Sequence, residues 1–156
     1  MTLAGGLGEA GCSIVVEHLA DAAVVRSLIL RLGRAFGLDS VRASEAALVA
    51  SELSTNMVKY AGRGTVHVEQ ASGDDTFWIV ASDRGPGLPP EEEFFRDRMG
   101  RGAALGPDDP QRLGLGCGGG AIRRFSSETQ VLARPGGGTQ VRCRFSISPP
   151  GRQGTK

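Results

Sequence analysis

An acid and an amide stand four residues apart in the stretch SELSTNMVKYAG, which covers residues 51–62. Residues at positions i and i+4 are neighbours on the surface of an α-helix, so Glu52 and Asn56 would project side by side if this stretch is helical. A carboxylate can take a proton from a hydroxyl group, and an amide oxygen suits a hard cation such as Mg²⁺. An ordinary polar helix flank would carry the same pair, so the rest of the chain has to decide between the two interpretations.

Helical periodicity predicts where this pair lies on a helix over residues 39–61, at about 100° per residue. One face is apolar and is expected to pack in the core: Ala46, Val49, Ala50, Leu53, Met57 and Tyr60. Another face is expected to point toward solvent: Ser44, Ser51 and Thr55. A third line of side chains follows the border of the core: Glu45, Glu52, Asn56 and Lys59. That border suits the lining of a site, because packing anchors the helix while the side chains stay reachable.

A second candidate is the acid in SDRGPGLP, residues 82–89. Asp83 closes an apolar run that reads as a strand, and Gly85 and Gly87 follow it. An acid in this place can present its carboxylate to an amino group of a ligand, such as N6 of adenine, while glycines let the backbone come close. A simple Asp-Gly turn is the other interpretation.

Two glycine clusters follow later in the chain. LGLGCGGGAIRRF, residues 113–125, opens a predicted helix, and backbone amides at a helix N-terminus favour an anion such as a phosphate. It is not a Walker A loop, because no GK[ST] follows, and a flexible linker has similar composition. PGGGTQV, residues 135–141, predicts a hairpin turn with Thr139 entering the last strand.

The predicted elements that position these residues alternate clearly. The sequence predicts a strand at 12–18, helices at 20–37 and 39–61, strands at 65–70 and 76–83, helices at 91–99 and 120–125, and a hairpin at 128–147. Strands in hairpins beside segregated helices predict an α+β fold in which helices cover one face of a sheet. We expect one domain over residues 12–147, with disordered ends at 1–11 and 148–156.

Composition excludes several classes of protein. The chain has 156 residues, a net charge of +1 and 22% charged residues, so nothing global indicates nucleic acid or a membrane surface. Its apolar runs are too short to span a bilayer, and its N-terminus does not read as a signal peptide. Three scattered cysteines fit a reducing compartment, so we expect a cytoplasmic protein.

Four motifs in this order resemble those of the GHKL superfamily of ATPases and kinases. ELSTNMVKYA resembles the N box, DRGPG the first glycine box, GLGCG the second, and GGGT the closing threonine motif. The resemblance covers roughly residues 12–147, and it is strongest to the small bacterial serine kinases that regulate sigma factors, above all the switch kinase of the general stress response. It implies the Bergerat fold, a two-layer α/β sandwich whose mixed, mostly antiparallel sheet has helices on one face. The segment between the two glycine boxes is longer than is typical of the switch kinases.

The resemblance also implies roles for individual residues. Glu52 would be the catalytic base, Asn56 would ligate Mg²⁺, and Asp83 would accept a hydrogen bond from adenine N6. The backbone at Gly85 and Gly87 would approach the base, and Thr139 would support Asp83. A lid at about 97–118 would cover the phosphates, with these residues in contact: Gly114, Leu115, Gly116 and Gly118. Arg112 is a candidate for the γ-phosphate, although a solvated arginine is an equal interpretation.

The implied activity is that of an ATP- and Mg²⁺-dependent serine/threonine-protein kinase. Its substrate would be a STAS-domain antagonist or scaffold protein, and a PP2C-type phosphatase regulator or a sigma factor would be a further partner. The chain would be a monomer or a homodimer without nucleic-acid or membrane partners. The alternative is a binding module, an anti-sigma factor or phosphatase activator with little kinase activity. A histidine-kinase catalytic domain is the weakest hypothesis, because no helical hairpin with a phospho-accepting His precedes the N box.

Overall fold

The computed structural model describes residues 10–70, 75–87 and 118–147. The strands are β1 (Ala10–Val16), β2 (Gly64–Gln70), β3 (Thr76–Asp83), β4 (Glu128–Ala133) and β5 (Thr139–Ser146). The helices are α1 (Asp21–Ala35), α2 (Ser40–Ala61) and α4 (Gly118–Phe125). The element order therefore confirms the strand, two helices, two strands, helix and hairpin that the sequence predicts.

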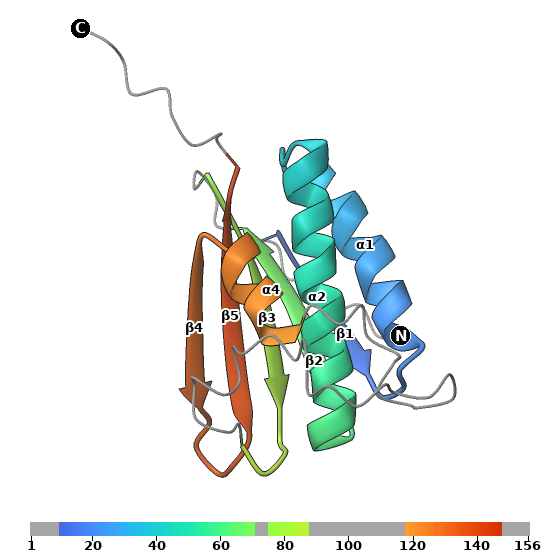
Figure 1. Cartoon of the computed structure of the whole chain (residues 1–156), viewed down its shortest axis with the longest axis vertical. Coiled ribbons are helices and arrows are strands. Elements are labelled where there is room, and N and C mark those ends of the chain that lie inside the picture. The colour runs from blue at the N-terminus through green and yellow to red at the C-terminus, as the bar shows by residue number, and fades with distance from the viewer. Residues whose placement is uncertain (1–9, 71–74, 88–117, 148–156) are drawn as a thin grey trace, which may run out of the picture.

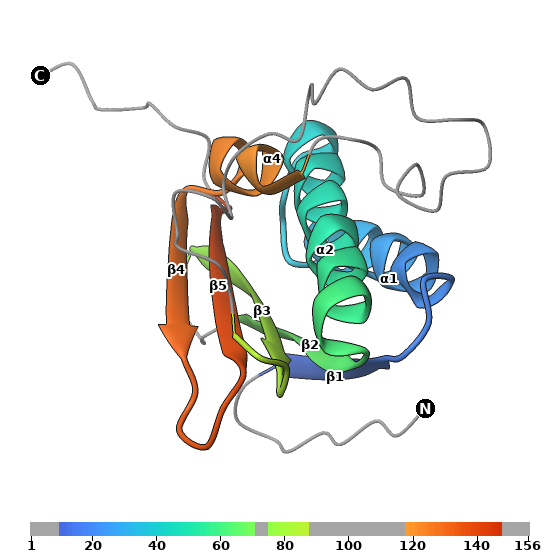
Figure 2. The same cartoon turned by 60° about the horizontal axis from the view of Figure 1, so that its bottom comes forward.

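The strands form one five-stranded sheet in the order β1-β2-β3-β5-β4. Each pairing between the described strands is antiparallel, so the parallel component of a mixed sheet is absent from this part of the chain. The three helices lie on one face of the sheet, as Figures 1 and 2 show. The expected two-layer α+β sandwich is confirmed.

The core fills the space between the helices and the sheet. Strand β5 alternates between buried and half-exposed residues, with Val141, Cys143 and Phe145 facing the helices. The Phe77 ring lies between the rings of Phe36 and Phe145, at centroid distances of 5.6 and 6.2 Å. Burial raises the pKa of the Cys143 thiol to about 11, so this cysteine stays protonated at neutral pH.

Helix α2 begins and ends where its capping residues predict. The Asp39 carboxylate accepts a hydrogen bond of 2.8 Å from the backbone N–H of Arg42, which satisfies a donor of the first turn. Gly62 ends the helix with φ 78°, a backbone conformation that favours glycine. The predicted start and end of the helix that carries Glu52 and Asn56 are thus confirmed.

The predicted faces of α2 need three corrections. Thr55, expected to face solvent, is 6% exposed, and its hydroxyl donates to the Ser51 carbonyl. Glu52, expected at a reachable border, is also 6% exposed. Tyr60, expected in the core, is 42% exposed because the last turn of α2 runs beyond it. The buried arc is wide because α2 packs against α1 and α4 as well as the sheet.

Some predicted boundaries also shift. Strand β1 begins at Ala10, two residues before the expected domain start, because it pairs with β2 along its whole length. Helix α4 begins at Gly118, two residues before the predicted helix at 120–125. The predicted helix at 91–99 and the expected disordered tail at 148–156 lie outside the described residues. Among the described helices, none has the length and apolar character that crossing a bilayer requires.

Candidate functional site

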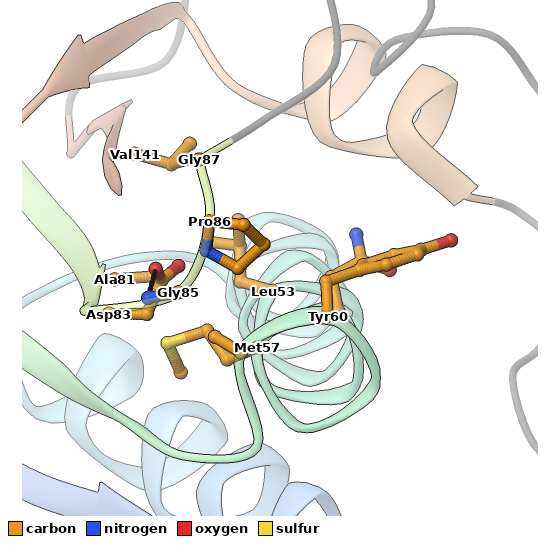
Figure 3. Close-up of a pocket in the computed structure, with 11 residues that line it drawn as sticks. Leu53, Met57, Tyr60, Ala81, Asp83, Gly85, Pro86, Gly87 and Val141 are labelled. Carbon is orange, nitrogen blue, oxygen red and sulfur yellow. Dashed lines mark hydrogen bonds between the residues drawn. The ribbon is translucent and has the colours of Figure 1, made fainter. Parts of the chain in front are cut away.

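A pocket opens where the last turns of α2 meet the loop after β3 (Figure 3). Helix α2 contributes Leu53, Asn56, Met57, Tyr60 and Ala61. Strand β3, its following loop and β5 contribute Ala81, Asp83, Gly85, Pro86, Gly87 and Val141. The pocket encloses about 390 Å³, its open mouth included, and small-molecule sites measure roughly 300–1,000 Å³. Its walls are mainly apolar, with a carboxylate and an amide as the polar groups.

The Asp83 carboxylate is oriented by two backbone donors. The N–H of Gly85 donates to Oδ1 at 2.9 Å, and the N–H of Thr139 donates to the same oxygen at 3.3 Å. Figure 3 shows the first of these bonds beside the pocket. Within the described residues both bonds end on Oδ1, so Oδ2 is the oxygen left for a ligand's hydrogen-bond donor.

The two glycines after Asp83 are required for different reasons. At Gly85 a Cβ would lie 2.6 Å from the Cβ and 2.9 Å from the Cα of Ala61, so the loop packs directly on the end of α2. At Gly87 the surrounding space is open, but φ is 97°, which is strained for any residue with a side chain. The loop can therefore line the pocket with backbone alone.

Helix α2 supplies the other wall. Asn56 is half-buried and lines the pocket, and Glu52 lies one turn earlier on the same helix. Figure 3 shows the Met57 side chain directed toward the Asp83 side, while the Tyr60 ring points away from Asp83. The amide of Asn56 and the carboxylate of Asp83 thus face one pocket from two elements.

The turn between β4 and β5, residues 134–138, closes over Asp83 from the other side. Arg134 Nη1 donates to the Asp83 carbonyl at 2.9 Å. A Cβ at Gly138 would collide with that carbonyl oxygen and would lie 2.7 Å from the Cα of Arg84. Sequence reasoning missed both contacts, although the run of three glycines at 136–138 was a signal that the backbone approaches something closely.

Comparisons with known proteins agree with this geometry. Residues 15–145 match the family described as histidine kinase-like ATPase domain. The chain belongs to this family. The match spans most of the chain and confirms the GHKL resemblance that the four motifs indicate.

Within the histidine kinase-like ATPase family, two relatives are informative. The serine/threonine-protein kinase RsbT of Bacillus subtilis (strain 168) is 27% identical over 125 residues, which cover 79% of this chain and 86% of RsbT. The crystal structure of the RsbU and RsbW domains of Rv1364c from Mycobacterium tuberculosis superposes with a TM-score of 0.59 at 17% identity. The superposition covers 93% of this chain but 34% of that longer chain, so it shows the fold alone. The chain is therefore a GHKL-type domain with similarity to a switch kinase.

The structure brings together some of the residues that the family motifs single out. Asn56, Asp83, Gly85 and Gly87 line one pocket, and the backbone of Thr139 bonds to Asp83. Gly118 is the first residue of α4. Four further predicted contacts of the lid lie outside the described residues and stay predictions: Arg112, Gly114, Leu115 and Gly116.

The donor set fits a cation that is shared with a ligand. In the described ranges, no group of three or more His, Cys, Asp or Glu side chains could hold a metal ion by itself. Mg²⁺ commonly binds proteins through one or two oxygen ligands, with substrate phosphates and water completing its octahedron. The amide oxygen of Asn56 fits such a site, because it lines the same pocket as the Asp83 carboxylate.

Proposed function

We propose that the protein is an ATP- and Mg²⁺-dependent serine/threonine-protein kinase of the anti-sigma or switch type. The observation that carries this proposal is the convergence of separate motifs on one pocket. Asn56 comes from the N box, Asp83 and the two loop glycines from the first glycine box, and Thr139 from the closing motif. These motifs are far apart in the sequence, so their meeting is not a consequence of local structure.

The pocket suits an adenine ring. Its apolar walls, which include Leu53, Met57 and Val141, would remove the faces of a flat base from water. Oδ2 of Asp83 would accept the hydrogen bond from the N6 amino group, while Oδ1 stays bound to the backbone. A carboxylate that is already oriented loses little freedom when the base binds, which favours affinity.

The phosphates would extend along α2 toward Asn56 and Glu52. Asn56 would hold Mg²⁺, which when bound would neutralise charge on the phosphate oxygens. The hydroxyl oxygen of the target Ser or Thr would form a bond to the γ-phosphorus, the bond from that phosphorus to the β–γ bridging oxygen would break, and ADP would leave. Glu52 would accept the proton of the attacking hydroxyl.

Similarity to RsbT supports a protein substrate and a role in partner switching. We propose a STAS-domain antagonist or stressosome scaffold protein as the phosphorylated partner. A PP2C-type phosphatase regulator or a sigma factor is the proposed second partner, bound when the first is released.

A second candidate function is a nucleotide-dependent binding module with little kinase activity. The observation that favours it is the burial of Glu52, which is 6% exposed. A general base must come within hydrogen-bond reach of the incoming hydroxyl, so this carboxylate has to be uncovered when a substrate docks. A protein that only binds partners would need no such change.

The test is the intact mass of purified STAS-domain proteins after incubation with the chain and Mg-ATP. Wild type is compared with Glu52→Ala and with Glu45→Ala, a control two turns earlier whose carboxylate pairs with Arg42 at 2.7 Å. Gain of one phosphate with wild type and Glu45→Ala, but not with Glu52→Ala, supports the kinase. Binding of Mg-ATP without any gain favours the binding module, and absence of Mg-ATP binding refutes both.

A further inference from the structure

The β4–β5 turn holds the corner at Asp83 through contacts from three of its residues or their neighbours. Arg134 donates to the Asp83 carbonyl, Gly138 packs on the same peptide, and Thr139 donates to the carboxylate. We propose that Arg134 is a positioning residue that sets the preference of the pocket for a purine carrying a 6-amino group. This inference rests on the proposed function, because it assigns Asp83 to the nucleotide base.

Arg134 is itself fixed by the turn that it begins. Its backbone N–H donates to the Gly138 carbonyl at 3.1 Å, and its carbonyl accepts from the Gly137 N–H at 3.1 Å. Gly136, Gly137 and Gly138 all have positive φ, which allows the turn to close this tightly. The guanidinium therefore projects from a closed loop, and only the long side chain has to be ordered to reach the strand end.

The target of the guanidinium matters as much as its reach. Arg134 Nη1 binds the backbone carbonyl of Asp83 at 2.9 Å, whereas the carboxylate of the same residue receives neutral backbone N–H groups. A charged donor makes a stronger hydrogen bond than a neutral one. The strand end is thus held firmly while Oδ2 stays available to a ligand, which an arginine paired with the carboxylate itself would prevent.

Loss of this bond would free the peptide that follows Asp83. The carbonyl would lose its charged donor, and the Asp83 carboxylate would be held by the Gly85 and Thr139 amides alone. An imprecisely placed Oδ2 would bind the 6-amino group less well. The rest of the nucleotide would be unaffected, because its apolar and phosphate contacts come from α2 and the other pocket walls.

The experiment compares the affinities of ATP and purine riboside triphosphate, which lacks only the 6-amino group, by calorimetry with Mg²⁺. Arg134→Met keeps the apolar stem and removes the donor, and Arg134→Lys restores one charged donor. Arg142→Met is the matched control, because Arg142 contacts Glu69 at 3.0 Å and the Trp78 ring on the open face of the sheet. Thermal unfolding of each variant shows whether the fold is intact.

We expect Arg134→Met to weaken ATP binding by about threefold to tenfold while the analogue loses less than about twofold. Arg134→Lys should recover the preference for ATP, and Arg142→Met should leave both affinities unchanged. A parallel loss for both nucleotides, or no loss for either, would overturn the positioning role while leaving the proposed function standing. A wild-type chain that binds neither nucleotide would instead refute the proposed function, and the inference with it.

Discussion

Replacing Asp83 by Asn tests the base-binding geometry most directly. In the wild type, Oδ1 accepts from the amides of Gly85 and Thr139 at 2.9 and 3.3 Å. The Asn side chain has one oxygen, and these two N–H groups can be satisfied only by that oxygen. Its NH₂ group must therefore occupy the place of Oδ2, where it would face the N6 amino group donor to donor.

The cost can be estimated from this arrangement. One hydrogen bond is lost and one polar group is left without a partner in a mainly apolar pocket, which together cost about 1–3 kcal/mol. This corresponds to ATP binding weaker by roughly 5- to 150-fold. The loop should keep its conformation, since the bonds from Gly85 and Thr139 remain, so the unfolding temperature should change little.

Calorimetric titration with Mg-ATP measures the effect, and purine riboside triphosphate serves as the reference nucleotide. The analogue has no 6-amino group, so Asp83→Asn should cost it much less than it costs ATP. Unchanged ATP affinity, or equal losses for the two nucleotides, would remove the Asp83 carboxylate from the base and refute the reasoning.

Three further predictions concern other residues. Glu52→Ala should leave ATP binding near normal and slow phosphoryl transfer by about 100-fold or more, and a full transfer rate in single-turnover assays would assign the proton to another group. Gly85→Ala should weaken ATP binding by about tenfold, because its Cβ would lie 2.6 Å from the Cβ of Ala61 and overpacking costs roughly 1–3 kcal/mol; adding Ala61→Gly should restore it. Cys12 should react with iodoacetamide before Cys143, whose pKa is raised to about 11 by burial, and raising the pH from neutral to about 9 should accelerate Cys12 alone. Peptide mapping that finds Cys143 alkylated first would contradict this order.

Local patterns predicted the elements that carry the site. Strand β3 matches the predicted range of 76–83 because its alternation is regular and Asp83 is followed by glycines that end the strand. Helix α2 was predicted from its periodicity and its capping residues, Asp39 and Gly62. The four family motifs gave the residues of the pocket, since each motif is a short stretch that can be recognised without knowing its neighbours.

Long-range packing was beyond the same patterns. Periodicity gives the direction of each side chain on α2, but not which elements cover it, so Thr55 and Glu52 were expected to be more exposed than they are. The bond from Arg134 to Asp83 joins residues 51 positions apart, and it exists only because β5 pairs with β3 and carries the β4–β5 turn to the strand end. Such a contact follows from topology and has no signature in either stretch.

Helix α2 carries Glu52, Asn56 and Tyr60 at intervals of four residues. A rise of about 1.5 Å per residue places successive members about 6 Å apart along a single axis. Because an α-helix resists compression, these three side chains can move only together, like marks on a ruler. Under the proposed roles, a partner that shifts α2 would leave the spacing of base and cation ligand intact. What it would change is the gap to the Asp83 corner of the sheet, where Gly85 rests on Ala61. Regulation of nucleotide binding would then act on that one junction between the two layers.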